Sequence, residues 1–241
     1  MCGILGLFKL GEQVNEEHFR ENLSRLDHRG PDGTDIVKIN KFPLNGLIGH
    51  TRLAIRGLGE QGAQPMRTDA TCISFNGEIY NTEELNSIIV KHGRKVNTSC
   101  DTETILIGFE VLGPKIFELL DGIFAIIIYE YNSQTIWLAR DFTGVKPLYY
   151  SIQPNQIAFG SEVEPVRRLI GLDEISRDGL SFYLQYGYSP PGSSIIKDLL
   201  KVNPGQILKI DFGNTVELQT KQIRNKFCAS SSLDDPREIR K

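Results

Sequence analysis

Cys2 is the first residue of this 241-residue chain whose type and position indicate chemistry. It follows Met1 and precedes a glycine and an apolar stretch, in the sequence MCGILGLF. Methionine aminopeptidase generally removes Met1 when a small residue follows, which gives Cys2 a free α-amino group. That amine, with a reference pKa near 8, can act as the general base for the thiol of its own residue. A separate catalytic histidine is then not required, and none of the four histidines lies in a Cys-His-Asn pattern.

Two oppositely charged residues, Arg52 and Asp101, are suited to a small molecule that carries both a carboxylate and an ammonium group. A guanidinium fork binds the carboxylate, and an acid binds the ammonium group. If that molecule carries an amide to be cleaved, Asn76 and Gly77 can supply the N–H donors of an oxyanion hole. Structural interpretations stay open, with Arg52 as a solvent-facing strand residue and Asp101 as the cap of the following helix.

The elements that must position these residues follow from apolar periodicity and turn signals. We expect strands at 1–8, 46–55 and 72–80, and helices at 15–26, 81–89 and 101–113. Asn15 is the expected cap of the first helix. Asn81 is the expected cap of the second, where Glu84 completes a capping-box spacing. Gly113 and Pro114 are expected to stop the third.

The second half of the chain predicts mainly short strands. From Ile123 onward, apolar segments of five to eight residues alternate with turn signals, which predicts an antiparallel meander up to about residue 161. Helices are expected at 162–170 and 177–186, followed by a strand at 203–210. Because strands run together and helices are segregated, the fold class is α+β, a layered sandwich.

Composition excludes several classes of protein. The net charge of −3 arises from mixed acids and bases, without the basic stripe that nucleic-acid binding requires. The longest apolar run, at 123–129, is too short to span a bilayer, and no secretory signal is recognisable, so we expect a cytoplasmic protein with no membrane partner. Four widely separated cysteines predict neither disulfides nor a zinc site.

Ten stretches, in order from Met1 to about Gln206, resemble the class II glutamine amidotransferases, which are N-terminal nucleophile hydrolases. The branch that the chain resembles is the glutaminase domain of glutamine-dependent asparagine synthetase. The stretches are MCGILGLF, HRGPDG, GHTRLAI, GAQPM, FNGEIYN, SCDTETI, LDGIFAIIIYE, RDFTGVKPLYY, FGSEV and NPGQ. The resemblance implies a four-layer αββα sandwich of two antiparallel sheets flanked by helices.

The resemblance also implies a role for each candidate residue in the hydrolysis of the glutamine side-chain amide. Cys2 would be the nucleophile and its freed amine the base. Arg52 would hold the α-carboxylate of glutamine, and Asp101 and Glu78 would recognise the α-ammonium end. Asn76 with Gly77 would form the oxyanion hole. HRGPDG is expected to shape the pocket loop, GAQPM to form a turn and RDFTGVKPLYY to form a hairpin against the core, without chemical roles.

The expected division of the chain is a glutaminase domain at 2–210 and a C-terminal hairpin and linker at 211–241, directed toward an absent synthetase domain. SSSLDDP, at 230–236, echoes the pyrophosphate loop of such a domain but lacks its glycines, so we interpret it as a linker with a helix N-cap. ATP and Mg²⁺ are therefore expected only in the missing domain, and this chain needs no cofactor or metal.

The expected partners are glutamine and a synthetase domain or subunit that receives the ammonia, with a homodimer left open. Two alternatives to asparagine synthesis remain. The same chemistry could supply another acceptor, such as a sugar or a natural-product carboxylate, because the missing half determines the acceptor. A catalytically silent interaction module is disfavoured, because Cys2 and the oxyanion pair are both present.

Overall fold

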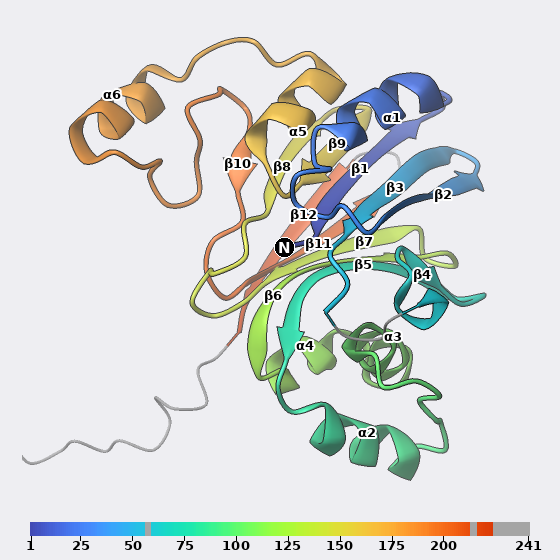
Figure 1. The fold of residues 1–241 in the computed structure, drawn as a ribbon. Coiled ribbons are helices and arrows are strands. Elements are labelled where there is room, and N and C mark those ends of the chain that lie inside the picture. Colours follow the sequence, from blue (N-terminus) through green and yellow to red (C-terminus); the bar gives the residue numbers. More distant parts are fainter. Residues whose placement is uncertain (56–58, 213–215, 224–241) are drawn as a thin grey trace, which may run out of the picture.

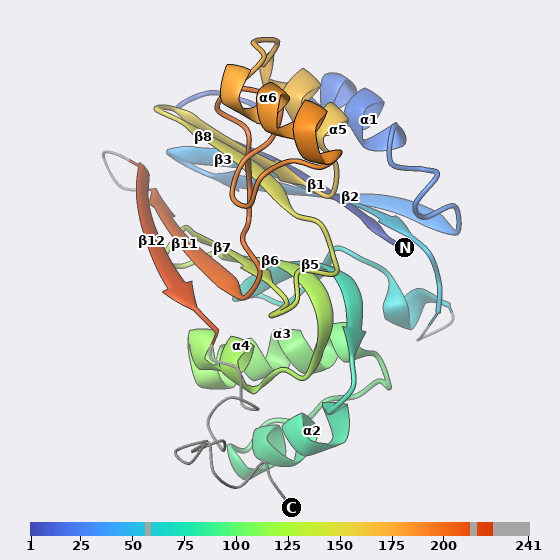
Figure 2. The same ribbon diagram turned by 90° about the vertical axis from the view of Figure 1, so that its left-hand side faces the viewer.

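Two antiparallel β-sheets pack face to face, and helices lie on the outer face of each (Figures 1 and 2). The computed structural model describes residues 1–55, 59–212 and 216–223. The predicted α+β fold, a four-layer αββα sandwich, is confirmed.

The first sheet has the strand order β10-β8-β9-β1-β3-β2. Its strands are β1 (Gly3–Leu10), β2 (Gly33–Lys41), β3 (Leu44–Arg52), β8 (Tyr149–Gln153), β9 (Gln156–Gly160) and β10 (Leu200–Lys201). The strands predicted at 1–8 and 46–55 are confirmed as β1 and β3. β2 was not predicted, because it is an edge strand in which only Val37 and Ile39 are buried, so its sequence lacks an apolar run.

The second sheet has the strand order β12-β11-β7-β6-β5-β4. Its strands are β4 (Met66–Arg67), β5 (Thr71–Ile79), β6 (Gly122–Glu130), β7 (Thr135–Arg140), β11 (Gln206–Phe212) and β12 (Val216–Gln222). β5 and β11 confirm the strands predicted at 72–80 and 203–210. The expected domain boundary after residue 210 falls inside β11, and the division of the chain there stays a prediction. The predicted linker at 230–236 lies outside the described residues.

The single meander predicted from Ile123 onward is wrong. β6 and β7 form a hairpin in the second sheet, whereas β8 and β9 form a hairpin in the first. The segment between Arg140 and Tyr149 crosses from one sheet to the other. Apolar alternation and turn residues predict strands but do not specify which sheet a strand joins, so the crossing resembles an ordinary turn in the sequence.

Helices enclose the two sheets. Sheet one is covered by α1 (Glu16–Ser24) and α5 (Val163–Ile170), and sheet two by α3 (Asp101–Leu112) and α4 (Ile116–Leu119) (Figures 1 and 2). α2 (Thr82–Lys91) packs mainly on α3, and α6 (Arg177–Tyr186) projects from the body. Two short 3₁₀ helices occupy Glu60–Gly62 and Gly113–Lys115. No helix in the described part of the chain combines the length and the apolar character needed to cross a bilayer.

Side-chain caps confirm one prediction and correct another. Asn15 caps α1 as expected, because its side-chain oxygen accepts a hydrogen bond from the His18 N–H at 3.0 Å. Asn81 occupies the N-cap position of α2, as expected, but its side chain accepts no hydrogen bond from the first turn of the helix and donates to the Glu84 carboxylate at 3.2 Å. The Asn81 oxygen accepts from the Asp121 N–H at 3.0 Å and its amide nitrogen donates to the Leu119 carbonyl at 2.9 Å. Asn81 therefore ties α2 to the turn before β6, a tertiary use that local spacing cannot reveal.

Candidate active site

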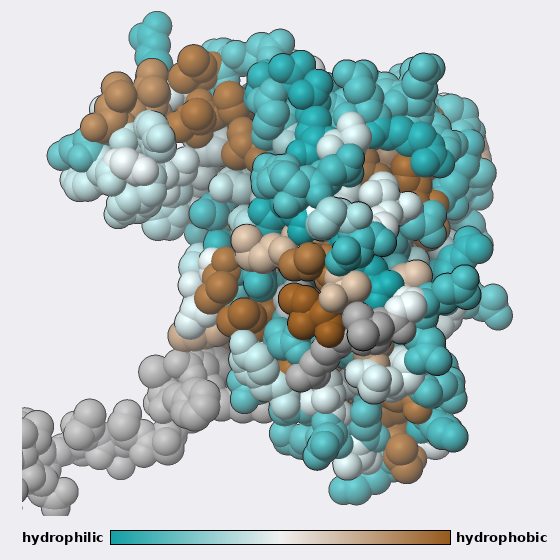
Figure 3. Space-filling model, in the orientation of Figure 1, coloured by the Kyte–Doolittle hydropathy of each residue, from teal (hydrophilic) through white to brown (hydrophobic). Residues whose placement is uncertain are grey.

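One pocket brings together all six residues that the sequence analysis singled out. It is lined by Cys2, which precedes β1, by Arg52 at the end of β3, by Asn76, Gly77 and Glu78 of β5, and by Asp101 at the start of α3. The residues come from both sheets and from a helix. Figure 3 shows apolar surface around the point where Figure 1 marks the N-terminus. Met1 and Ile55, which line the pocket, are exposed.

Steric restriction by β3 and Leu26 explains the glycine that follows Cys2. A Cβ atom at Gly3 would lie 2.5 Å from the Thr51 hydroxyl and 2.8 Å from Cβ of Leu26, so β1 can approach β3 here only with glycine. This close approach places the Cys2 sulfur against the backbone that follows β3, where it accepts a hydrogen bond from the Leu53 N–H at 3.4 Å.

The surroundings of Cys2 act on its thiol in opposite directions. Burial raises the pKa of the Cys2 thiol, because it disfavours the thiolate. The Leu53 N–H and the positive charges of the chain terminus, Arg52 and Lys146 act against this rise in pKa. Reactivity at neutral pH therefore depends on how much positive charge the pocket supplies.

Arg29, in the HRGPDG stretch, fixes the backbone of Cys2. Its guanidinium donates to the Cys2 carbonyl at 3.0 Å and to Glu162 at 2.9 Å. In the same stretch, Asp32 accepts from the Ala54 N–H at 2.7 Å, beyond the end of β3. The sequence analysis expected HRGPDG to shape the pocket loop but did not identify Arg29 as an anchor, because nothing in the local sequence connects it to Cys2.

The surroundings of Asn76 and Gly77 suit the oxyanion-hole donors that were expected from these two residues. Asn76 is buried, and its amide nitrogen has no hydrogen-bond partner among the described residues. At Gly77, a Cβ atom would lie 2.2 Å from the Ile123 carbonyl oxygen, so only glycine fits.

Backbone hydrogen bonds of β5 point the Gly77 N–H toward the pocket. Gly77 lies opposite Phe124 of β6, and both backbone groups of Phe124 bond to Asp141 on its other side. Along the opposite edge of β5, the Phe75 N–H donates to Gln64 at 2.7 Å and the Ile79 N–H to Asp101 at 3.3 Å. In an antiparallel strand every second residue donates to the same side, so the Gly77 N–H lies on this pocket side, between the other two.

Neither Arg52 nor Asp101 has the purely structural position that the sequence left open for it. Arg52 lines the pocket and donates to the Gly59 carbonyl at 2.7 Å, so it is not simply a solvent-facing strand residue. Asp101 is 4% exposed and is the first residue of α3, whereas Cys100 takes the cap position. The Asp101 carboxylate accepts from the Thr102 N–H at 3.0 Å and from Ile79, which joins the start of α3 to the end of β5.

Gln64 and Lys146 line the pocket although neither was predicted as a site residue. Gln64, in GAQPM, accepts the Phe75 N–H and lines the pocket. Lys146, in RDFTGVKPLYY, also lines the pocket, although that stretch was expected to be a hairpin without a chemical role. The signal for both is their place in the quoted stretches. Only the sheet crossing at 140–149 reveals that Lys146 lines the same pocket as Cys2.

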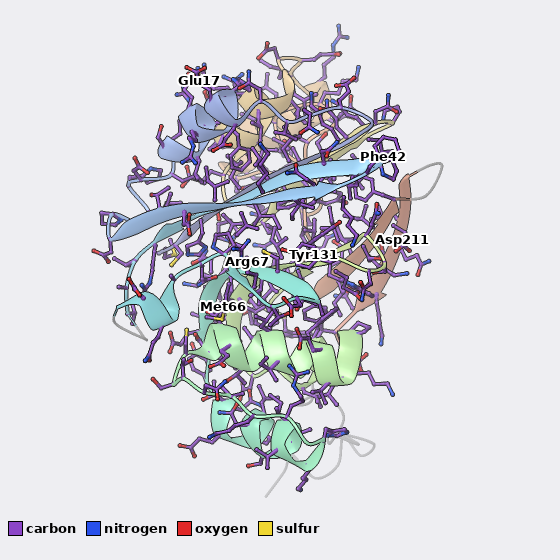
Figure 4. The ribbon with its side chains drawn as sticks, turned by 90° about the vertical axis from the view of Figure 1, so that its right-hand side faces the viewer. Glu17, Phe42, Met66, Arg67, Tyr131 and Asp211 are labelled. Atoms are coloured by element: carbon purple, nitrogen blue, oxygen red, sulfur yellow. The ribbon has the colours of Figure 1, made fainter. Side chains whose placement is uncertain are left out.

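The rest of the described chain offers no competing centre for the same chemistry. No group of three or more His, Cys, Asp or Glu residues is placed to hold a metal ion within the described ranges. The described cysteines Cys2, Cys72 and Cys100 are free thiols, and Cys228 lies outside these ranges. A wider hollow at the opposite end of the sandwich is lined by the far end of β2 with Arg67 and Tyr131, which Figure 4 labels between the sheets. It contains none of the six candidates.

Comparison with known proteins decides the family. The profile of the family described as "Glutamine amidotransferase domain" matches residues 1–221. The chain belongs to this family. A putative glutamine-hydrolysing asparagine synthetase of Methanocaldococcus jannaschii is 32% identical over 231 residues, which cover 88% of this chain and 44% of that protein. Asparagine synthetase 3 of Bacillus subtilis is 31% identical, over 86% of this chain and 34% of that protein.

Solved structures agree on the fold. The allosteric regulatory enzyme of purine biosynthesis matches with a TM-score of 0.68 at 20% identity, over 92% of this chain and 49% of that chain. Glutamine phosphoribosylpyrophosphate amidotransferase from B. subtilis matches with a TM-score of 0.67 at 20% identity, over the same shares. This chain therefore spans less than half the length of each of these four proteins.

Proposed function

We propose that this glutamine amidotransferase domain hydrolyses the side-chain amide of glutamine to glutamate and ammonia, with Cys2 as nucleophile. The observation that carries the proposal is the unpartnered, buried amide nitrogen of Asn76, which lines the same pocket as the Cys2 thiol and the Gly77 N–H. A buried donor without a partner is costly unless a ligand fills it, and an oxyanion is the ligand that two N–H donors favour.

The reaction needs one nucleophile and one base. The Cys2 amine takes the thiol proton, and the thiolate attacks the amide carbon of glutamine. The carbonyl oxygen becomes an oxyanion held by Asn76 and Gly77. The protonated amine then gives its proton to the leaving nitrogen, so the C–N bond breaks, ammonia departs and a γ-glutamyl thioester remains. Water, losing a proton to the amine, attacks the thioester; the C–S bond breaks and glutamate leaves.

The amine is available only after Met1 is removed, because in a chain that retains Met1 the Cys2 nitrogen is an amide of negligible basicity. Met1 itself lines the pocket, so a chain that retains Met1 also keeps this side chain next to the proposed substrate site. The active species in this proposal therefore begins at Cys2.

Arg52, Glu78 and Asp101 hold the backbone end of glutamine in this proposal. The guanidinium of Arg52 binds the α-carboxylate, and the two acids bind the α-ammonium group. All three line the pocket with Cys2, which supports this assignment of roles.

The ammonia acceptor is proposed to be a synthetase domain or subunit that amidates aspartate, in keeping with the names of the relatives. ATP and Mg²⁺ would bind to that partner. Another acceptor, such as a sugar or a natural-product carboxylate, remains the alternative, and a homodimer remains open. We also propose a cytoplasmic location, because a reducing compartment keeps the Cys2 thiol reduced.

A glutaminase assay tests the proposal. The purified chain, confirmed by intact mass to begin at Cys2, is incubated with glutamine, and glutamate and ammonia are measured separately. We expect equal amounts of both, formed by the wild type and not by Cys2→Ala. Absence of both products from a folded, Met1-free wild type, with and without an added synthetase partner, would support the silent interaction module instead.

A further inference from the structure

The loop between β7 and β8 has an unusually complete set of internal hydrogen bonds. Asp141, which is fully buried, accepts with one carboxylate oxygen from the Thr143 N–H, the Thr143 hydroxyl and the Val145 N–H at 3.1, 2.7 and 3.0 Å. Its other oxygen accepts from the Phe124 N–H at 3.2 Å and the Lys146 N–H at 3.1 Å. One carboxylate thereby fixes the whole turn and ties it to β6.

Arg140 holds the same loop from the carbonyl side. Its guanidinium donates to the Lys146 carbonyl at 2.7 Å, to the Val202 carbonyl at 2.6 Å and to the Gly144 carbonyl. Both the N–H and the C=O of Lys146 are therefore bonded to buried charged side chains. Charge-assisted hydrogen bonds of this kind are stronger than neutral ones, so the Lys146 backbone is rigidly placed.

The side chains of the loop divide between solvent and pocket. Phe142 and Val145 are 45% and 53% exposed, whereas Lys146 is half-buried and lines the pocket with Cys2. Among the described residues, the Lys146 ammonium forms no salt bridge. Its charge is therefore not neutralised by a neighbouring acid and acts on the thiol of Cys2, whose pKa it lowers.

The charges in the pocket favour a second cation besides Arg52. Glutamine carries one carboxylate, which Arg52 binds in the function proposed above. The protonated Cys2 amine offsets part of the negative charge that develops on the sulfur, and a second cation adds to this effect in a pocket that also holds the acids Glu78 and Asp101. Among the described residues that line the pocket, Lys146 is the other basic one.

We infer that the ammonium group of Lys146, which lines the pocket with Cys2, stabilises the Cys2 thiolate electrostatically, and that Asp141 and Arg140 are positioning residues that hold the Lys146 backbone at this pocket. The inference rests on the proposed function only for the use of that thiolate. The charge effect itself can be measured without glutamine.

The test is the pH dependence of Cys2 alkylation by iodoacetamide, followed by mass spectrometry of the N-terminal peptide. Only the thiolate reacts, so the profile reports the pKa of the Cys2 thiol. In Lys146→Met we expect that pKa to rise and alkylation at neutral pH to slow by about threefold. Lys146→Arg keeps the charge and should restore most of the rate. All samples are matched for Met1 content by intact mass.

Two controls make the result decisive. Lys9→Met removes the same charge at the far end of β1, where Lys9 pairs with Glu12 at 3.5 Å, and should leave the profile unchanged. If Lys146→Met is misfolded by circular dichroism, Lys146→Gln takes its place. An unchanged profile in the folded neutral variant, or equal slowing in Lys146→Arg, would overturn the inference. A wild type that alkylates normally but hydrolyses no glutamine would refute the proposed function and leave this result standing.

Discussion

Cys2 and Cys72 are the same chemical group in two regions of one layer. Cys72 lies in β5, fully buried in the core between the two sheets, and burial raises its thiol pKa to about 12. Cys2 lies at the end of that layer, is partly exposed, and has the Leu53 N–H and the charges of Arg52 and Lys146 to oppose the effect of burial on its pKa. The pKa of a cysteine thiol in this protein therefore depends on its place in the sandwich and on the charges around it.

β5 connects these two environments. Alternate residues of a strand share a face, so Cys72, Ser74 and Asn76 all point into the layer between the sheets. Along this row the surroundings change from apolar core at Cys72 to the candidate active site at Asn76. Ser74, in between, contacts the His50 ring of β3 at 3.0 Å.

The largest contrast should appear when each thiol is removed. Cys2→Ala should lower kcat for glutamine hydrolysis by about a thousandfold or more, because it removes the thiol that forms the thioester. Cys72→Ala should keep the wild-type kcat and lose only stability, since it creates a cavity in the core. Glutaminase kinetics and urea unfolding of both variants measure the two effects. Loss of kcat in a folded Cys72→Ala would remove the distinction.

A large effect is also expected at the pocket end of β5. Asn76→Ala removes one oxyanion donor and should lower kcat by about 100- to 1,000-fold with little change in KM. The matched control is Asn45→Ala, which removes a buried amide at the far end of β3, where it bonds to the Glu12 carbonyl. Steady-state kinetics should show a normal kcat for the control. A normal kcat in Asn76→Ala would exclude Asn76 from the oxyanion hole.

A smaller effect is expected at the carboxylate clamp. Arg52→Lys replaces a bidentate fork by a point charge and should raise KM for glutamine by about tenfold, with a smaller change in kcat. Arg67→Lys, at the hollow on the opposite end of the sandwich, should leave KM unchanged. The comparison is made by initial rates over a range of glutamine concentrations. Identical KM values in the two variants would place Arg52 outside the substrate site.

His50, between the two regions, should affect acid stability rather than the chemistry of either thiol. It is fully buried, which lowers its pKa from 6.5 to about 3. Between those two pKa values the unfolded chain therefore binds one more proton than the folded chain. The free energy of unfolding decreases as the pH falls through this window, by about 1.4 kcal/mol per pH unit at most. Urea unfolding at several pH values should show a flatter dependence for His50→Gln, whereas His18→Gln on the exposed side of α1 should match the wild type. An equally steep dependence in His50→Gln would contradict this assignment.

The sequence predicted the candidate site better than it predicted the fold around it. Cys2, Arg52, Asn76 and Asp101 lie in short stretches whose residue types suggest chemistry locally, and each lies in or next to an apolar segment that predicts an element. Their convergence on one pocket could be proposed from the family resemblance. Lys146 could not, because its approach to Cys2 depends on a chain crossing between sheets.

The fold predictions failed where tertiary contacts override local signals. β2 has too few buried residues to produce an apolar pattern, and the Asn81 side chain bonds to the turn before β6 as well as to Glu84 of its own helix. The split of the predicted meander depends on Asp141 and Arg140, whose side chains bond backbone groups of the crossing loop. A turn of similar sequence without these buried bonds would allow the next strand to continue the same sheet.

The central claim, that a Met1-free Cys2 cleaves glutamine through a covalent intermediate, is tested most directly by trapping that intermediate. The protein is mixed with glutamine and quenched in acid within the first turnover, and its N-terminal peptide is analysed by mass spectrometry. We predict a γ-glutamyl group on Cys2 in a peptide that begins with Cys2. The account would be contradicted by a γ-glutamyl group on another cysteine, or by glutamate formed from protein that still carries Met1.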